Sequence, residues 1–250
     1  MEWNTVIYED CLNAVNGLPT MEANSIELGY TDYPWGSNME QNIRKYHNRE
    51  LDNNKGKQFF DDSKETITEE FTLQWFEQFQ RVTIKQVLVI PESHKQFWYR
   101  NTDPTADVPV LWKNGFSGSK IAKKSKKSTY LFYGKFEKDK KLKFDYIAKQ
   151  YYTKTTSIVP FTLKWGFCSD QKHFIHPSPK GLDVALHILK MLKPESLLDP
   201  FAGSGSYLKA ADILRIKWLG FEINPIYKQD IDKRLSQQYI DNYKDIGSSC

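Results

Sequence analysis

Apolar and polar positions follow a clear pattern near the end of the chain. Leu197 and Leu198 form a short apolar run that ends at Asp199, after which the chain turns through a proline and two glycines. Residues 207–216 carry apolar side chains at helical spacing, and a second short apolar run follows at 218–223. The pattern predicts a strand, a glycine turn, a helix and a further strand.

The rest of the chain shows similar patterns. Alternating or short apolar runs predict strands at 5–8, 26–30, 86–90, 111–112 and 129–134. Helical spacing predicts helices at 10–15, 66–79, 184–192 and 231–239. Asp10 is expected to cap the first of these helices, and Thr66 with Glu69 forms a capping box for the second. Residues 37–64 are polar and 104–109 are rich in turn residues, so both predict irregular structure.

Strands and helices alternate along much of the chain, which favours an α/β fold. We expect a Rossmann-like, mostly parallel sheet with helices on both faces, plus a small lysine-rich insertion. A chain of 250 residues can bury one substantial core, so residues 1–250 are predicted to form a single domain. Within it, residues 113–165 would form a small basic region.

The glycine turn has features of a nucleotide site. Glycines allow backbone conformations that a Cβ forbids, and they let a ligand approach the main chain. Glu222 follows Asp199 by 23 residues, close to the spacing of an acid that binds ribose hydroxyls. The turn has no lysine and matches no phosphate loop, so it suits an adenosine cofactor without phosphates, of which S-adenosylmethionine is the common example. The alternative is a tight turn that serves only the fold.

Lysines are concentrated in the middle of the chain. The formal net charge of the whole chain is +4, but residues 113–154 hold thirteen lysines and three acids. Such a patch is typical of a protein that contacts a phosphate backbone. Its densest run contains Lys123, Lys124, Lys126 and Lys127, which we expect to bind nucleic acid; a solvated loop is the alternative reading.

Cysteine usage and hydropathy indicate whether the protein binds a metal, which redox compartment it suits and whether it spans a membrane. Cys11, Cys168 and Cys250 lack metal-ligand spacing, so no metal site is expected. A chain of this size without paired cysteines fits a reducing compartment, and we expect a cytoplasmic protein. No apolar run approaches the length of a membrane span, so no membrane partner is expected.

Five separated motifs together resemble one family, the DNA amino-methyltransferases of the circularly permuted β group, which modify adenine N6 or cytosine N4. In chain order they are YEDCL at 8–12, TDYPW at 31–35, HPSPK at 176–180, DPFAGSGS at 199–206 and GFEINP at 220–225. The resemblance thus extends over most of the chain. The order and spacing of the five motifs are together more specific than any single motif.

The resemblance implies a role for each matching residue. The expected S-adenosylmethionine pocket is lined by Asp199, Phe201, Gly203 and Gly205, with Glu222 on the ribose, Asp10 and the Cys11 backbone on the adenine, and His176 and Lys180 at the methionine end. The catalytic loop would consist of Asp32, Tyr33, Pro34 and Trp35.

The chemistry of amine methylation explains these residue types. The lone pair of an exocyclic amine is delocalised into the base, so acceptors must bind its hydrogens and favour a tetrahedral nitrogen. The Asp32 carboxylate and the Tyr33 carbonyl can supply two acceptors. Trp35 would stack on a base that has been flipped out of the helix. The family usually has proline where this chain has Tyr33, but the carbonyl is retained and Pro34 still favours an extended Tyr33.

We therefore predict a DNA methyltransferase that acts on adenine N6. Cytosine N4 is the close alternative, because only the leading Asp of the catalytic motif favours adenine. A catalytically degenerate protein that binds nucleic acid is the alternative from another class, and RNA is the alternative substrate. The short span between Tyr133 and His176 leaves little room for a recognition domain, so the candidate partners besides DNA are a second copy of the chain and a restriction or specificity subunit.

Overall fold

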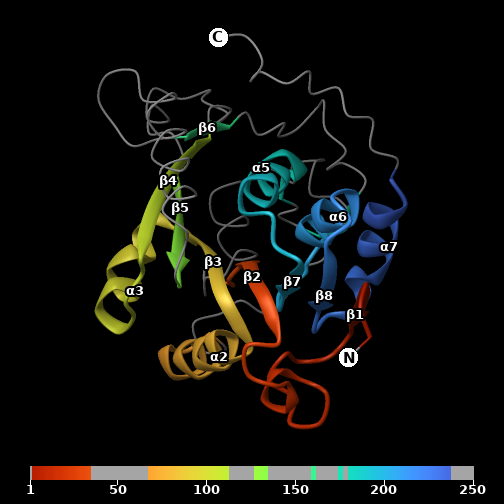
Figure 1. Ribbon diagram of the computed structural model, residues 1–250, viewed down its shortest axis with the longest axis horizontal. Coiled ribbons are helices and arrows are strands. Elements are labelled where there is room, and N and C mark those ends of the chain that lie inside the picture. Colours follow the sequence, from red (N-terminus) through yellow and green to blue (C-terminus); the bar gives the residue numbers. More distant parts are fainter. Residues whose placement is uncertain are drawn as a thin grey trace, which may run out of the picture.

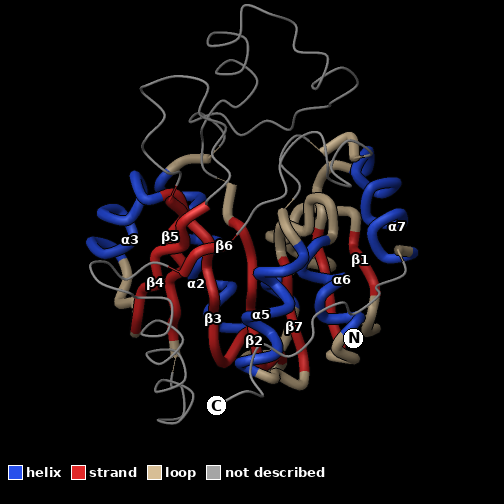
Figure 2. Tube along the Cα trace, turned by 90° about the horizontal axis from the view of Figure 1, so that it is seen from above, coloured by secondary structure: helices blue, strands red, loops and turns tan. Residues whose placement is uncertain are grey.

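The computed structural model describes residues 2–34, 67–112, 127–134, 159–161, 174–176 and 180–237. The strands of these segments form one sheet in the order β1-β8-β7-β2-β3-β5-β4-β6 (Figures 1 and 2). Their bounds are β1 Thr5–Ile7, β2 Ile26–Asp32, β3 Thr83–Pro91, β4 Ala106–Trp112, β5 Lys127–Tyr133, β6 Val159–Phe161, β7 Ser196–Asp199 and β8 Lys217–Phe221. Neighbouring strands are parallel except where β5 pairs with β3 and β4.

Helices cover both faces of this sheet (Figure 1). The described α-helices are α2 Glu69–Val82, α3 Lys95–Asn101, α5 Leu182–Leu192, α6 Ser206–Ile213 and α7 Lys228–Ser236, and the short 3₁₀ helices are η1 Leu18–Thr20, η3 Glu92–His94 and η5 Pro225–Tyr227. One hydrophobic core forms against α5 and α6, and the other against α2 and α3. The expected Rossmann-like α/β class is confirmed.

The core on the α2 side is rich in aromatic rings. Trp75 and Phe79 lie one helical turn apart on the buried face of α2 and stack with ring centroids 5.0 Å apart. Phe79 packs against the backbone of β2 at Gly29, where an added Cβ would lie only 2.3 Å from the ring. Glycine at this strand position therefore lets the helix approach the sheet closely.

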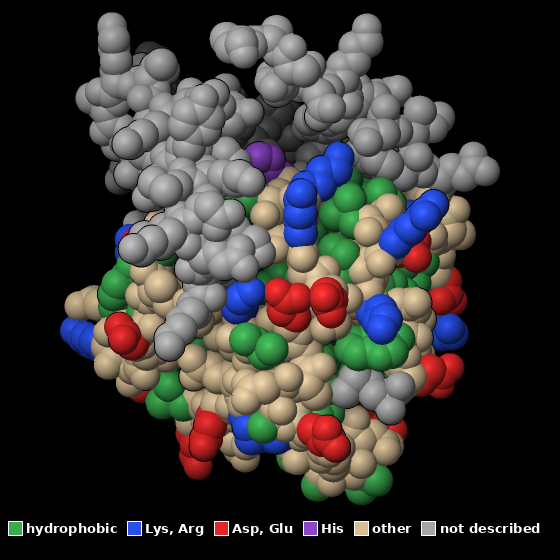
Figure 3. All heavy atoms as spheres, viewed as in Figure 1, with side chains coloured by type: hydrophobic (Ala, Val, Ile, Leu, Met, Phe, Trp, Pro, Cys, Tyr) green, Lys and Arg blue, Asp and Glu red, His purple; other side chains and the backbone are tan. Residues whose placement is uncertain are grey.

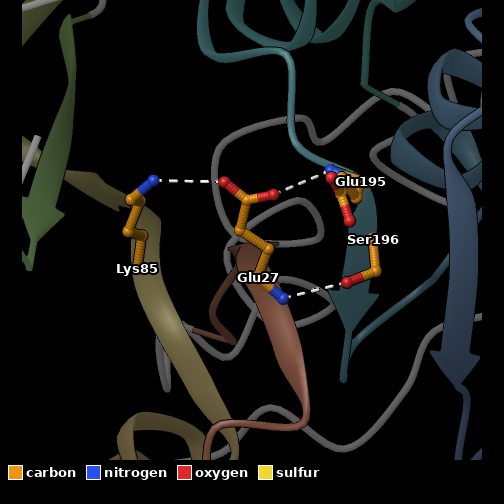
Figure 4. A network of polar contacts seen from close by, with 4 residues as sticks. All are labelled: Glu27, Lys85, Glu195 and Ser196. Atoms are coloured by element: carbon orange, nitrogen blue, oxygen red, sulfur yellow. Dashed lines mark hydrogen bonds and ion pairs between the residues drawn. The ribbon is translucent and has the colours of Figure 1, made fainter. Parts of the chain in front are cut away.

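Strand register is reinforced at the amino-terminal ends of three central strands (Figure 4). Glu27 on β2 forms an ion pair with Lys85 on β3 at 3.1 Å. Its other carboxylate oxygen accepts a hydrogen bond from the Glu195 backbone N–H at 2.8 Å, and its own N–H donates to Ser196 Oγ at 2.9 Å. Because one residue binds both neighbouring strands, β2 is held in register at the sheet edge opposite the carboxyl ends.

Some local expectations were wrong. Residues 10–16 form turns rather than a helix, because the side chains of Asp10 and Asn13 accept hydrogen bonds from nearby backbone N–H groups. The N-cap of α2 is Thr68, whose Oγ1 accepts from the Phe71 N–H, and not Thr66. The expected turn at 104–109 lies largely within β4, and α3 was not anticipated.

Several sequence expectations fall on residues that the structure does not describe. These are Trp35, the loop at 37–64, and three of the four lysines of the basic run, namely Lys123, Lys124 and Lys126. Within the described ranges, no helix is long and apolar enough to cross a membrane. The His, Cys, Asp and Glu side chains of the same ranges form no cluster suited to a metal ion.

Candidate active site

Three acids lie at or just beyond the carboxyl ends of adjacent parallel strands. Asp32 is the last residue of β2, Asp199 is the last of β7, and Glu222 immediately follows β8. The strand order β8-β7-β2 brings these ends to one edge of the sheet. In open α/β sheets this edge is where ligands bind. The sheet thus unites two motifs that are 167 residues apart in sequence, at Asp32 and Asp199.

The glycine turn depends on left-handed backbone conformations. Gly203 has φ of 52° and Gly205 has φ of 73°. A Cβ added at Gly203 would also lie 2.9 Å from His176 Nε2. Two independent reasons, backbone conformation and space, therefore require glycine at position 203.

Glu222 holds this turn in place. Its Oε2 accepts a hydrogen bond from the Gly203 N–H at 2.7 Å, and its Oε1 accepts from the Asn224 N–H at 2.9 Å. Burial raises the pKa of Glu222 to about 7, although these two hydrogen bonds act in the opposite direction. Each carboxylate oxygen can accept further hydrogen bonds, so a role on ribose is compatible with this one.

Asp199 is fully buried beside the turn. Its Oδ1 accepts hydrogen bonds from Thr31 Oγ1 at 2.7 Å and from the Phe201 N–H at 3.2 Å. Among the described residues, its Oδ2 has no hydrogen-bond partner. Burial raises the pKa of Asp199 to about 7. An unpartnered buried carboxylate oxygen is costly, which is expected where a ligand supplies the missing partner.

Asp32 forms an ion pair with Lys180. Asp32 Oδ2 lies 2.7 Å from Lys180 Nζ, and both side chains are mostly buried. Burial raises the pKa of Asp32, and the Lys180 ammonium opposes that shift. The residue expected at the methionine end of a cofactor thus contacts the residue expected to bind the target amine. Sequence reasoning missed this contact.

Tyr33 points away from this acid and into the aromatic core. Its ring lies 4.8 Å from the Trp75 ring and 5.5 Å from the Phe201 ring, measured between centroids. Its hydroxyl is 2.5 Å from Thr72 Oγ1. Burial raises the pKa of the Tyr33 phenol well above its usual value. The tyrosine therefore fills a core position, which explains how the chain accommodates it where proline is usual.

The adenine end of the expected pocket lies beside Glu222. The Glu222 N–H donates to the Ile7 carbonyl on β1, which places the chain leading to Asp10 and Cys11 next to this acid. Cys11 is buried, and its pKa is raised by burial and by the charges of Asp10 and Glu222. Asp10 is exposed, with its Oδ1 accepting from the Leu12 N–H.

His176 is held by a residue that sequence reasoning missed. Asp230 on α7 is almost fully buried, and its two carboxylate oxygens accept from the N–H groups of Ile175 at 2.9 Å and His176 at 2.6 Å. The His176 ring also packs edge-on against Tyr227, with centroids 4.6 Å apart. An available signal was the position of Asp230, an acid on the same helical face as Tyr227 and Ile231.

Replacing Asp230 with Asn should loosen the segment at 174–176. An amide has one carbonyl acceptor and places an NH₂ group opposite an N–H donor, so one of the two hydrogen bonds is lost at a cost of about 2 kcal/mol. Hydrogen exchange at Ile175 and His176 should become faster, while β7 stays protected. Asp232→Asn is the matched control, since Asp232 is exposed on the same helix. Unchanged protection at 175 and 176 would show that Asp230 does not hold the segment.

Fold and site together define an α/β protein with a ligand-binding edge built around a glycine turn and three acids. The sequence profile of the DNA methylase family matches residues 26–233. The chain belongs to the DNA methylase family, and the resemblance noted in the sequence is confirmed. A comparison with curated proteins gives no match.

Solved structures share the fold at low sequence identity. An M1.HpyAVI–SAM complex has a TM-score of 0.58 at 15% identity, covering 93% of this chain and 99% of that chain. A putative DNA modification methylase from Thermus thermophilus, complexed with S-adenosyl-L-methionine, has a TM-score of 0.53 at 17% identity, covering 92% of each chain. The cytosine-N4-specific PvuII DNA methyltransferase has a TM-score of 0.57 at 14% identity, covering 94% of this chain and 87% of that chain.

Proposed function

We propose that the protein is an S-adenosylmethionine-dependent DNA methyltransferase that methylates the N6 amine of a flipped adenine. Family membership supports DNA methylation. The observation that carries the site assignment is the Asp32–Lys180 ion pair, because it joins the acid of one motif to the basic residue of another. Methylation of an amine requires the residue that binds the amine to lie close to the residues that bind the cofactor.

The described residues fit this cofactor. The buried Asp199 Oδ2 has no partner among them, and the left-handed Gly203 and Gly205 place no Cβ atom at two positions of the turn. In our assignment the turn holds the cofactor with Asp199, Phe201, Gly203 and Gly205, while Glu222 binds ribose, Asp10 and Cys11 bind adenine, and His176 and Lys180 bind the methionine end. S-adenosylmethionine supplies an electrophilic methyl group in such a site, and two neighbours of the same fold are complexes with it.

The catalytic residues of the chain bind the amine and prepare it for attack. The Asp32 carboxylate and the Tyr33 carbonyl accept its two hydrogens, so that its lone pair is free to attack. Transfer of the methyl group from the cofactor sulfur would leave this nitrogen with one proton to release, which the Asp32 carboxylate would accept. Pro34 keeps Tyr33 extended, and Trp35 stacks on the flipped base.

The target base is tested by mass spectrometry of nucleosides from treated DNA. The leading Asp32 of the catalytic motif favours adenine, so N6-methyl-2′-deoxyadenosine is the expected product. N4-methylcytosine would preserve the mechanism and change the base, as in the cytosine-N4-specific neighbour. The absence of both products, with cofactor binding retained, would favour an RNA substrate or a catalytically degenerate nucleic-acid binder.

The basic region at 113–165 has the positive charge expected of a surface that binds DNA. Acidic and basic side chains are mixed on the described face in Figure 3, whereas the lysine excess lies at 113–154 in the sequence. Lys127 begins β5, so the dense lysine run leads directly into the sheet. We assign DNA contact to this region, and target selection to it or to a second subunit or specificity partner.

Replacing Lys123, Lys124, Lys126 and Lys127 together with Gln should weaken DNA binding and flatten its salt dependence. Each lost phosphate contact removes about 0.9 from the slope of log K against log salt concentration, so a change of up to about 3 to 4 is expected. Fluorescence anisotropy across a salt series measures the slope. A quadruple variant with the wild-type slope would remove this run from the interface.

A further inference from the structure

Lys180 connects two parts of the site. Its backbone carbonyl accepts a hydrogen bond from Ser206 Oγ at 2.7 Å, and Ser206 begins α6 directly after the glycine turn. Its ammonium lies 2.7 Å from Asp32 Oδ2 at the end of β2. One residue is thus anchored by its backbone to the turn and by its side chain to the acid expected to bind the target amine.

The surroundings of Asp32 are unfavourable for a negative charge. The titratable groups that interact electrostatically with it are Tyr30 on its own strand β2, Tyr130 on β5, Tyr207 on α6 and Asp199 on β7. Three of these are buried phenols, and the fourth is a second carboxyl group. Burial and a nearby like charge both favour the protonated form of a carboxyl group. Among the described residues, Lys180 supplies the opposing positive charge.

The two carboxylate oxygens of Asp32 have different surroundings. Oδ2 is bound to Lys180, whereas Oδ1 is buried without a hydrogen-bond partner among the described residues. A buried acceptor without a partner is costly, and the amine of a flipped base is a donor of the right kind. The ion pair therefore leaves one anionic oxygen for the substrate.

Building on the proposed function, we propose that Lys180 is a positioning residue of the transfer reaction: its ammonium keeps Asp32 ionised and bound through Oδ2, so that Oδ1 accepts the target amine. An ionised acceptor binds an N–H donor more strongly than a neutral one does. It also balances the positive charge that the nitrogen acquires when it takes the methyl group, and it can accept the proton released afterwards.

The test is the pH profile of Lys180→Met in single-turnover methylation at saturating DNA and cofactor. Without the ammonium, Asp32 should remain protonated to higher pH, so the variant should lose rate at low pH first. Relative to its own rate at about pH 8.5, its rate at about pH 6 should fall severalfold more than that of wild type, because loss of the opposing ammonium raises the pKa of Asp32 further. Lys180→Arg keeps the charge and should retain the wild-type profile. Lys190→Met, on the α5 helix that begins just after Lys180, is the control, because Lys190 is exposed.

If Lys180 had a purely structural role, Lys180→Met would lose the same fraction of its rate at every pH. That result would overturn the proposal. A second readout does not depend on activity: ¹³C NMR of the carboxyl groups, with the Asp32 signal assigned by Asp32→Asn. The Asp32 signal should titrate at higher pH in Lys180→Met than in wild type, and equal titration would refute the proposal. If wild type transfers no methyl group, the proposed function fails while this titration still tests the pair.

Discussion

Asp32→Asn should reduce methyl transfer by at least about 100-fold, the range found when one transition-state acceptor or donor is removed. The substitution preserves shape but replaces an anionic oxygen with an NH₂ group, which cannot accept the hydrogens of the target amine. Cofactor affinity should change little, because the carboxylate is assigned to the base. Rapid-quench measurement of the single-turnover rate, together with calorimetry for the cofactor, separates the two effects.

Asp107→Asn is the matched control for this prediction. Asp107 is also a strand aspartate that is paired with a lysine, Lys95, but it lies on β4, three places from β2 in the sheet. Its substitution should leave transfer near the wild-type rate. An Asp32→Asn variant that retains wild-type transfer would show that Asp32 does not bind the reacting amine.

Glu222→Gln should weaken cofactor binding by about 100-fold. The carboxylate is assigned to the ribose hydroxyls and also holds the Gly203 N–H at 2.7 Å. A glutamine offers only one oxygen, so at least one charged hydrogen bond of about 1.5 to 3 kcal/mol is lost, and the turn loosens as well. Calorimetric titration with S-adenosylhomocysteine measures the loss without requiring turnover. Glu195→Gln, at an exposed site before β7, serves as the control.

The same acid predicts the pH dependence of cofactor binding by the wild-type protein. Burial raises the pKa of Glu222 to about 7, so the free protein increasingly binds a proton there as the pH falls below 7. A protonated carboxyl group is a poorer acceptor for ribose, and affinity should therefore fall as the pH decreases from about 8 to about 6. Affinity that is constant over this range, or unchanged in Glu222→Gln, would contradict the ribose assignment.

Local features of the site were predictable from the sequence. The strand, glycine turn and helix at 196–213 follow from short-range patterning, and so does the spacing from Asp199 to Glu222. The parallel order of β8, β7 and β2 then places Asp32 at the same edge, as the α/β class requires. The fold class and the gathering of these acids could therefore be predicted without coordinates.

Contacts between distant segments could not be predicted in this way. Lys180 and Asp32 are 148 residues apart, and Asp230 lies 54 residues after His176, so no periodicity connects them. The Tyr33 ring points into the core because it packs against Trp75 of α2. The TDYPW motif at 31–35 carries no information about that helix. At 10–16, local side-chain hydrogen bonds prevailed over helical spacing.

The proposed activity and its catalytic site are tested most directly by transfer of a labelled methyl group from S-adenosylmethionine to unmethylated DNA, with wild type and Asp32→Asn compared under identical conditions. We expect label on an exocyclic amine of DNA with wild type and its near-complete loss with Asp32→Asn. No label with wild type, despite measurable cofactor binding, would contradict the proposed activity. Equal label with both proteins would contradict the catalytic site.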